Sequence, residues 1–167
     1  HFIIPNTRFT LAMSSKKIEV KKNLSIRNRK ASHEYHFIDK YVAGIVLKGT
    51  EIKSLRTGKV SLNESYCLFI GEELWVRNMH ISPYKLAGHN NHEAKNDRKL
   101  LLTKKELTKL KAGAQDTGTT IIPTHLFIND RGLAKLEVAL AKGKKLYDKR
   151  HDIREKDAKR ELDKLKI

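Results

Sequence analysis

The sequence predicts a mainly β protein, and three features of its residue pattern support this fold class. Apolar and polar residues alternate with a period of two along several short segments of residues 33–141, as expected for strands with one buried face. Turn-forming residues separate two pairs of these segments. Helical periodicity is confined to two short stretches. Such a pattern is typical of a small antiparallel β-barrel of the OB type, here with two or three peripheral helices and a flexible basic C-terminal tail.

The predicted strands begin near residue 41 and end near residue 141. In the first strand, the run YVAGIVLKG places four apolar side chains on one face: Tyr41, Ala43, Ile45 and Leu47. Two hairpins are predicted where alternating segments flank a turn, namely 65–70 with 74–81 and 120–128 with 133–141. Pro123 lacks an amide hydrogen, so we expect its strand to lie at a sheet edge or to contain a bulge.

Two helices are predicted between the strands. Thr103 and Glu106 form a capping-box pair at the start of residues 103–118, where leucines follow at helical spacing. A shorter helix is predicted over residues 49–58, which begin and end near glycines, with two inward-facing side chains, Ile52 and Leu55.

The charge of the chain predicts a polyanionic partner. There are 35 Lys and Arg residues against 19 Asp and Glu, a formal net charge of +16. Nucleic acid is the first candidate, and an anionic membrane surface is the second. The membrane alternative is disfavoured because neither basic segment carries the apolar face of an interfacial helix. No apolar run approaches the roughly 18 residues of a membrane span, so no membrane partner is expected.

The distribution of charge divides the chain into three predicted parts: a leader and basic flexible arm (1–27), an OB-like barrel (28–141) and a basic tail (142–167). Residues 1–13 lack a signal-peptide pattern and are expected to be a leader or an upstream extension. Residues 16–30 hold seven Lys or Arg and one acidic residue, which indicates a flexible arm. The tail holds eleven basic and six acidic residues but no continuous apolar stripe. We expect it to be disordered or frayed alone and helical when bound.

Metal-binding and catalytic motifs are weak in this sequence. His80, His89 and His92 are close in sequence, but they lack zinc-site spacing and cysteine partners, which favours an exposed polar loop. Cys67 is the single cysteine, so an intramolecular disulfide is excluded, and its place in an alternating strand predicts a core residue. There is no Gly-rich phosphate loop and no nucleophile elbow. We therefore expect no metal, no cofactor and no enzymatic activity.

RNA binding is the function that the residue types favour. A basic surface with exposed aromatic rings neutralises phosphates and stacks on unpaired bases. Most aromatic residues fall on strand faces, where core packing is expected. Tyr147 differs because it lies in the charged run KKLYDKR of the tail rather than on a strand face, which favours an intermolecular contact.

Five segments resemble the SmpB family, the small protein B that binds transfer-messenger RNA (SsrA RNA). They are NRKASHEY (28–35), AGIVLKGTEIKSLRTGK (43–59), ISPY (81–84), RKLLL (98–102) and AKGKKLYDKR (141–150). The resemblance covers about residues 28–155 in the order of the family. It implies an OB-type barrel that acts as a cytoplasmic, monomeric RNA-binding adaptor of trans-translation rather than as an enzyme.

The partners that the resemblance implies are all parts of ribosome rescue. The barrel would bind the tRNA-like domain of transfer-messenger RNA, carried as the alanyl form by elongation factor Tu, and deliver it to stalled ribosomes. The tail would sense the empty mRNA channel beside the small-subunit decoding centre. The alternatives are a general OB-fold RNA-binding or ribosome-associated protein without a dedicated partner, and an RNA-processing enzyme with acidic residues in the barrel rim.

The resemblance also assigns residues. The implied RNA-binding residues are Asn28, Arg29, Lys30, Lys99, Leu101 and Lys135. The implied ribosome-binding residues of the tail are Gly143, Lys144, Lys145, Tyr147, Asp148, Lys149 and Arg150. Two positions depart from the family: Val42 replaces an acidic residue implicated in RNA binding, and Ser32 stands where an arginine is usual. These departures weaken the assignment at positions 42 and 32.

Overall fold

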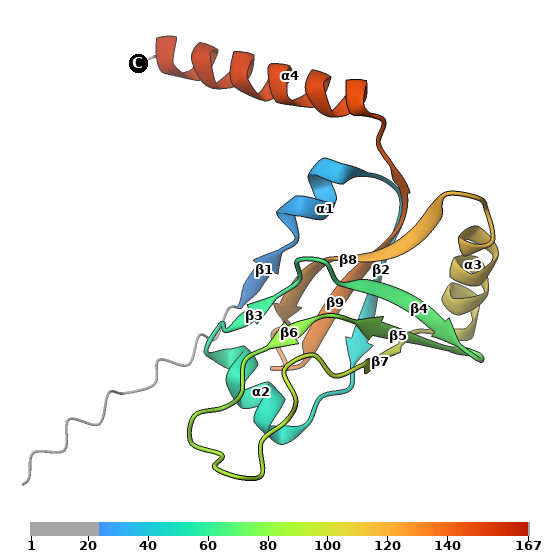
Figure 1. Cartoon of the computed structure of the whole chain (residues 1–167), viewed down its shortest axis with the longest axis vertical. Helices are drawn as coiled ribbons and strands as arrows, with labels where there is room; N and C mark the ends of the chain where they lie inside the picture. Colours follow the sequence, from blue (N-terminus) through green and yellow to red (C-terminus); the bar gives the residue numbers. More distant parts are fainter. Residues whose placement is uncertain (1–23, 167) are drawn as a thin grey trace, which may run out of the picture.

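The computed structural model describes residues 24–166 and has the shape of a small barrel with a projecting helix (Figure 1). Its elements, in chain order, are β1 (Ser25–Arg27), α1 (Arg29–Glu34), β2 (Tyr35–Ile45), α2 (Gly49–Arg56), β3 (Val60–Ser61), β4 (Tyr66–Ile70), β5 (Glu73–Arg77), β6 (His80–Ile81), β7 (Arg98–Leu101), α3 (Lys104–Ala114), β8 (Thr119–Ile128), β9 (Ala134–Gly143) and α4 (Leu146–Leu165). The predicted leader and most of the predicted arm lie outside the described residues.

Six antiparallel strands form a closed ring. The main sheet has the order β1-β8-β4-β5-β7-β2-β9, and β8 also pairs with β9, so the sheet closes on itself. β1 pairs with the C-terminal half of β8, while β3 and β6 form a separate two-stranded sheet. The predicted mainly β architecture with peripheral helices is confirmed, and the ring is compatible with an OB-type barrel. Closure leaves the ring strands without free edges.

The interior of the ring is filled by the alternating apolar residues of the strands. Ala43, Leu74, Val76, Leu126, Leu136 and Val138 are completely or almost completely buried. Leu55 of α2 and Leu110 of α3 are also fully buried and join the same core cluster from outside the sheet. Cys67 lies in this core, as its strand position predicts. Burial of these side chains is the main stabilising contribution to the barrel.

The predicted hairpins and helices are confirmed. β4 pairs with β5 and β8 pairs with β9, across the turns that the sequence indicates. The predicted strand over residues 74–81 is wrong in its last part, because β5 ends at Arg77 and β6 pairs with β3 instead. In β8 the register shifts between Pro123 and His125, so the bulge alternative is right and the edge alternative is wrong for this proline. α3 begins at the capping box of Thr103 and Glu106, in which each side chain bonds the backbone of the other residue.

The flexible arm is a wrong prediction for its last residues. Ser25–Arg27 form β1, and Arg29–Glu34 form the short helix α1, which the sequence pattern does not reveal. Contacts with the barrel hold these two elements in place. The amide of Asn28 donates to the carbonyl of Thr124 in β8 at 2.8 Å, and the Leu24 side chain is buried in the main core. Because these contacts are made to a distant strand, the local composition carries no signal for them.

The tail is a 20-residue helix, α4, in the described structure. None of its residues is buried, which agrees with the predicted lack of an apolar stripe. It lies beyond α1 at one end of the molecule, and α2 lies at the opposite end (Figure 1). β9 extends to Gly143, so the barrel continues two residues past its predicted limit at residue 141.

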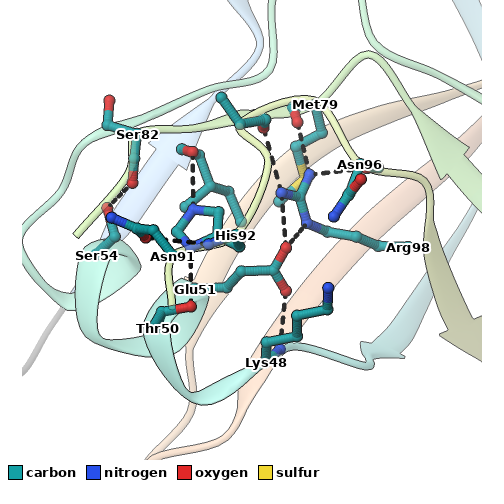
Figure 2. Close-up of polar contacts among 12 residues, drawn as sticks. Lys48, Thr50, Glu51, Ser54, Met79, Ser82, Asn91, His92, Asn96 and Arg98 are labelled. Carbon is teal, nitrogen blue, oxygen red and sulfur yellow. Dashed lines mark hydrogen bonds and ion pairs between the residues drawn. The ribbon is translucent and has the colours of Figure 1, made fainter. Parts of the chain in front are cut away.

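A buried ion pair fixes the long connection between β6 and β7. Arg98 and Glu51 are both almost fully buried, with the Arg98 Nε atom 2.9 Å from the Glu51 carboxylate (Figure 2). The other guanidinium nitrogens donate to two backbone carbonyl groups of this connection, those of Ala94 and Asn96, and to the carbonyl of Met79 just before β6. Because every donor has a partner, the pair holds the loop to α2 without leaving a buried charge unpaired.

His92 is a structural residue of the same loop. Its Nδ1 atom lies 2.9 Å from the Thr50 hydroxyl, and its Nε2 atom lies 3.1 Å from the Ile81 carbonyl (Figure 2). The predicted exposed loop is therefore wrong at His92, which is 5% exposed. Both ring nitrogens are occupied, which leaves none for a metal ion.

Candidate nucleic-acid interface

Leu101 and Lys135 lie on the same outer face of the barrel. Gly44 of β2 is in register with Leu101 of β7 on one side and with Lys135 of β9 on the other. Residues directly opposite in a sheet point to the same face, and the neighbours of Gly44 show that this face is the outside: Ala43 is buried, and Leu101 is 53% exposed. Lys99 is two residues before Leu101 and shares the face.

The same outer face continues to the N-terminal strand. Glu137 is in register with Val42 on β2 and with His125 on β8. His125 is in turn opposite Arg27 of β1. One continuous outer surface, here called the outer sheet face, is therefore formed by side chains of β7, β2, β9, β8 and β1. It is defined by Lys99, Leu101, Val42, Gly44, Lys135, Glu137, His125, Phe127 and Arg27.

Asn28 joins this face to α1 and has no free polar group. Its Oδ1 atom accepts a hydrogen bond from the Ala31 amide at 3.1 Å, which caps α1. Its Nδ2 atom donates to the carbonyls of Leu62 at 3.2 Å and Pro123 at 3.0 Å. The side chain is thus committed to three protein partners, and the residue is 5% exposed. This geometry gives Asn28 a positioning role for its two basic neighbours.

Arg29 and Lys30 are both exposed in the first turn of α1. The Lys30 ammonium lies 3.4 Å from the exposed Glu64 carboxylate, a pair that contributes little to stability. Because Asn28 fixes the start of the helix, the Arg29 side chain begins at the end of β1, beside the outer sheet face. Lys99, by contrast, is paired with Glu73 at 2.5 Å, and this hydrogen bond lowers the pKa of the Glu73 carboxyl group.

Glu137 is an acidic residue within the otherwise basic outer sheet face. It accepts a hydrogen bond from the Thr124 hydroxyl at 2.8 Å and lies 3.6 Å from the Lys40 ammonium. Position 42 holds a valine where the family resemblance leads us to expect an acidic residue. Glu137 on the adjacent strand β9 is in register with Val42 and places a carboxylate next to that position. The sequence pattern shows that Glu137 lies on the solvent side, but only the strand register places it opposite Val42.

The predicted tail residues fall into two groups: Gly143 and Lys144 lie where the chain leaves the barrel, and the others lie in or next to the first turns of α4. Gly143 ends β9, and Lys144 is half-buried where the chain leaves the barrel, with its amide donating to the Glu34 carbonyl at 2.8 Å. Tyr147 is 68% exposed near the start of α4, so it does not pack on the barrel. The remaining predicted residues of the tail are also in or next to the first turns of α4: Lys145, Asp148, Lys149 and Arg150.

Other kinds of site have little support in the described residues. Within residues 24–166, one group of possible ligands is close enough to share a cation, His151, Asp152 and Glu155, but it lies on an exposed helix and Asp152 already accepts a hydrogen bond from Lys144. None of the described helices combines the length and apolar character needed to cross a membrane.

Comparisons with known proteins show which family the chain resembles. The profile of the SmpB protein family matches residues 25–166. The SsrA-binding protein of Phocaeicola vulgatus is 58% identical over 142 residues, which are 85% of this chain and 95% of that protein. The SsrA-binding protein of Cytophaga hutchinsonii is 56% identical over 155 residues, 93% of this chain and all of that protein.

A solved structure extends the similarity to three dimensions. It is described as "tmRNA-SmpB: a journey to the center of the bacterial ribosome", and its matching chain is 43% identical with a TM-score of 0.63. The match covers 73% of this chain and 85% of that one. The family profile includes both the barrel and the tail helix, and the relatives are similar over nearly their whole length. The chain therefore belongs to the SmpB family.

Proposed function

We propose that this protein is the RNA-binding adaptor of trans-translation in its cell. It binds the tRNA-like domain of transfer-messenger RNA and delivers that RNA to ribosomes stalled on messages without a usable stop codon. The alanyl form of the RNA arrives with elongation factor Tu, and the partners are all cytoplasmic. The protein acts as a monomer and catalyses no reaction itself.

The observation that carries the RNA-binding half of this proposal is the outer sheet face. Leu101 and Lys135, which the family resemblance implies as RNA-binding residues, lie side by side across Gly44. Arg27 lies at the other end of the same face, next to Arg29. A surface that combines basic and apolar groups binds both the phosphates and the exposed parts of a folded RNA. Within it, Asn28 positions Arg29 and Lys30 rather than contacting the RNA.

The observation that supports the ribosome-binding half is the exposure of α4. Its residues Tyr147, Lys149 and Arg150 have no partner in the barrel core, and the helix projects from the body (Figure 1). A basic helix of this kind suits an RNA-walled channel such as the empty mRNA path, where its cations meet phosphates. We assign to α4 the sensing of that vacant channel.

Removal of α4 separates the two halves of the proposal. A chain that ends at Lys145 keeps all of β9, and it should retain most of its affinity for the tRNA-like domain while losing tagging on stalled ribosomes. Normal tagging by this truncated chain would contradict the role of the tail. Binding is measured by filter retention, and tagging is measured in reconstituted translation on a message without a stop codon.

The alternative function is a general RNA-binding or ribosome-associated protein without a dedicated partner. It predicts similar affinities for transfer-messenger RNA, bulk tRNA and ribosomal RNA. A clear preference for transfer-messenger RNA in direct competition supports the adaptor, and equal affinities would support the alternative.

A further inference from the structure

The tail helix α4 leaves the barrel beside the end of α1 (Figure 1). Tyr35, the first residue of β2, is in register with Gly143, the last residue of β9. α1 ends directly before Tyr35, and only Lys144 and Lys145 separate β9 from α4. The ladder continues for one more hydrogen bond, because the Lys144 amide donates to the Glu34 carbonyl at 2.8 Å. The start of the tail is therefore fixed next to α1.

The direction of α4 beyond this point depends on side-chain contacts with the barrel. The N-cap residue of the helix is Lys145, whose side chain makes no capping hydrogen bond. Lysine is not among the residues that cap helices well. Because no residue of α4 is buried, the helix also lacks an apolar contact that would hold it on the barrel.

The Lys144 side chain bridges α1 and α4. Its ammonium group contacts the Asp152 carboxylate and donates to the Ser32 carbonyl at 3.4 Å. The Lys144 side chain is only 10% exposed, although it carries a charge. An ammonium group that is shielded from water needs such partners, so this bridge differs from an ordinary exposed ion pair.

A second contact joins the same face of α4 to the barrel. The His36 ring of β2 lies 3.7 Å from the carboxylate of Asp148. Asp148 and Asp152 are four residues apart, so they share one face of the helix. Their side chains are 27% and 31% exposed, whereas those of Glu155 and Asp157 are 69% and 61% exposed. The face that carries Asp148 and Asp152 therefore rests against the barrel.

These two contacts also fix the rotation of α4 about its own axis. Successive residues of a helix are about 100° apart, so Arg150 lies opposite the face of Asp148 and Asp152. Tyr147 lies about 120° from that face on the same reckoning. Both Tyr147 and Arg150 are exposed in the structure. The contacts thus decide which side chains of the tail point away from the barrel.

We propose that Lys144 is a positioning residue for the tail rather than a contact to the ribosome. Lys144 holds Asp152 at the end of α1, and the contact made by His36 supports it. Together they set the direction and rotation in which α4 presents Tyr147 and Arg150 to the mRNA channel. The inference rests on the proposed function of the tail, and it changes the role that the family resemblance implies for Lys144.

A double-mutant cycle on tagging tests whether Lys144 acts through Asp152. Lys144→Met keeps most of the aliphatic stem without the charge, and Asp152→Asn keeps the shape of the side chain. Each change should lower the tagging rate by about three- to tenfold, and the double variant should lower it no further, since the contact is already lost. A double variant that shows the product of the two losses would mean that each residue acts on its own, and would overturn the inference.

Lys111→Ala is the control for this cycle. Lys111 lies on α3 and contacts Glu72 at 2.9 Å, so the change removes a lysine from a similar pair away from the tail. It should leave tagging unchanged. Lys144→Met should also keep its affinity for the tRNA-like domain in filter retention and its melting temperature. A loss of RNA affinity that matches the loss of tagging would mean that Lys144 contacts that RNA, and would overturn the inference.

The position of α4 can be measured directly with two spin labels. Asn63→Cys and Lys164→Cys place labels at exposed positions on the barrel and near the end of α4, and the native Cys67 is buried. Double electron–electron resonance should give a narrow distribution of distances in this background. Adding Lys144→Met or Asp152→Asn should broaden it. A distribution that is equally narrow with Lys144→Met, or broad without it, would overturn the inference.

The inference and the proposed function fail in distinguishable ways, because the distance measurement needs neither RNA nor ribosomes. If the unaltered chain tags stalled products and Lys144→Met tags equally well, the positioning role is wrong and the proposed function stands. If the unaltered chain shows no preference for the tRNA-like domain over bulk tRNA and no tagging, the proposed function itself is wrong, whatever the distances are.

Discussion

Leu101 and Lys135 lie on one outer face of the barrel because both are in register with Gly44, from opposite sides of β2. Neither residue is close to the other in the sequence, and neither is needed for the core. They share this face because β2 pairs with β7 along one edge and with β9 along the other. This relationship allows their contributions to RNA binding to be separated.

Lys135→Ala and Leu101→Ser should weaken RNA binding in different ways. Loss of Lys135 removes a cation, so the slope of log K against log salt should fall by about 0.9. Loss of Leu101 removes an apolar contact, so the affinity should fall without a change in slope. Lys109→Ala on α3 is the charge control and should behave like the unaltered chain. Equal slopes for Lys135→Ala and the unaltered chain would contradict this prediction.

Asn28→Ala should destabilise the fold by about 2–4 kcal/mol, since it removes the cap of α1 and two buried hydrogen bonds, those from Asn28 Nδ2 to the carbonyls of Leu62 and Pro123. Urea unfolding measures the change, with Asn63→Ala at an exposed position as the control. RNA binding should be lost in step with stability. A stable Asn28→Ala protein that has lost RNA binding would instead indicate a direct contact between Asn28 and the RNA.

Arg98→Met should cost about 3–5 kcal/mol, because it leaves the buried Glu51 carboxylate without its partner. Amide hydrogen exchange should also become faster across residues 82–97, whose carbonyls the guanidinium holds. Arg77→Met is the matched control: its ion pair with Asp97 is partly exposed to solvent, so its removal should cost less than about 1 kcal/mol. Similar costs for the two variants would contradict the role of the buried pair.

Substitutions in the first turns of α4 should affect rescue rather than folding. Replacing Asp148, Lys149 and Arg150 by alanine, or Tyr147→Ala alone, should lower tagging by about tenfold or more, since stacking and charge-assisted contacts are worth about 1–3 kcal/mol each. Tyr147 is 68% exposed, so the melting temperature of Tyr147→Ala should remain unchanged. A lower melting temperature with normal tagging would show that the ring packs on the barrel.

The orientation of α4 should depend on pH. The hydrogen bond from Lys144 lowers the pKa of Asp152 below its ordinary value of 3.8. The contact is therefore fully present above that value and is lost as the pH falls through the lower pKa of the folded state. Energy transfer between dyes at positions 63 and 164 should change as the pH falls below 3.8. Asp152→Asn should show the low-pH signal at pH 7, and identical signals for both proteins at pH 7 would contradict this contact.

The elements that could be predicted from the sequence are those with a local cause. Strand alternation identifies the hairpins of β4 with β5 and β8 with β9, and the Thr103 and Glu106 pair identifies the start of α3. α1 and β1 could not be predicted, since they are held by β8 and by the three hydrogen bonds of Asn28. The polar neighbours of His92 predict an exposed side chain. In the structure the side chain is buried, because its ring nitrogens contact the Thr50 hydroxyl and the Ile81 carbonyl.

The sequence by itself determined the mainly β fold, the excess of positive charge and its concentration in two terminal segments, because these follow from residue type and short-range periodicity. The tertiary structure alone decided which charges lie together. The pairing of β2 with β7 and with β9 sets the register that places Leu101 and Lys135 on either side of Gly44 and Glu137 opposite Val42, and the Lys144–Asp152 contact joins α4 to the end of the barrel. Those groupings depend on contacts between residues far apart in the chain, which no local pattern encodes.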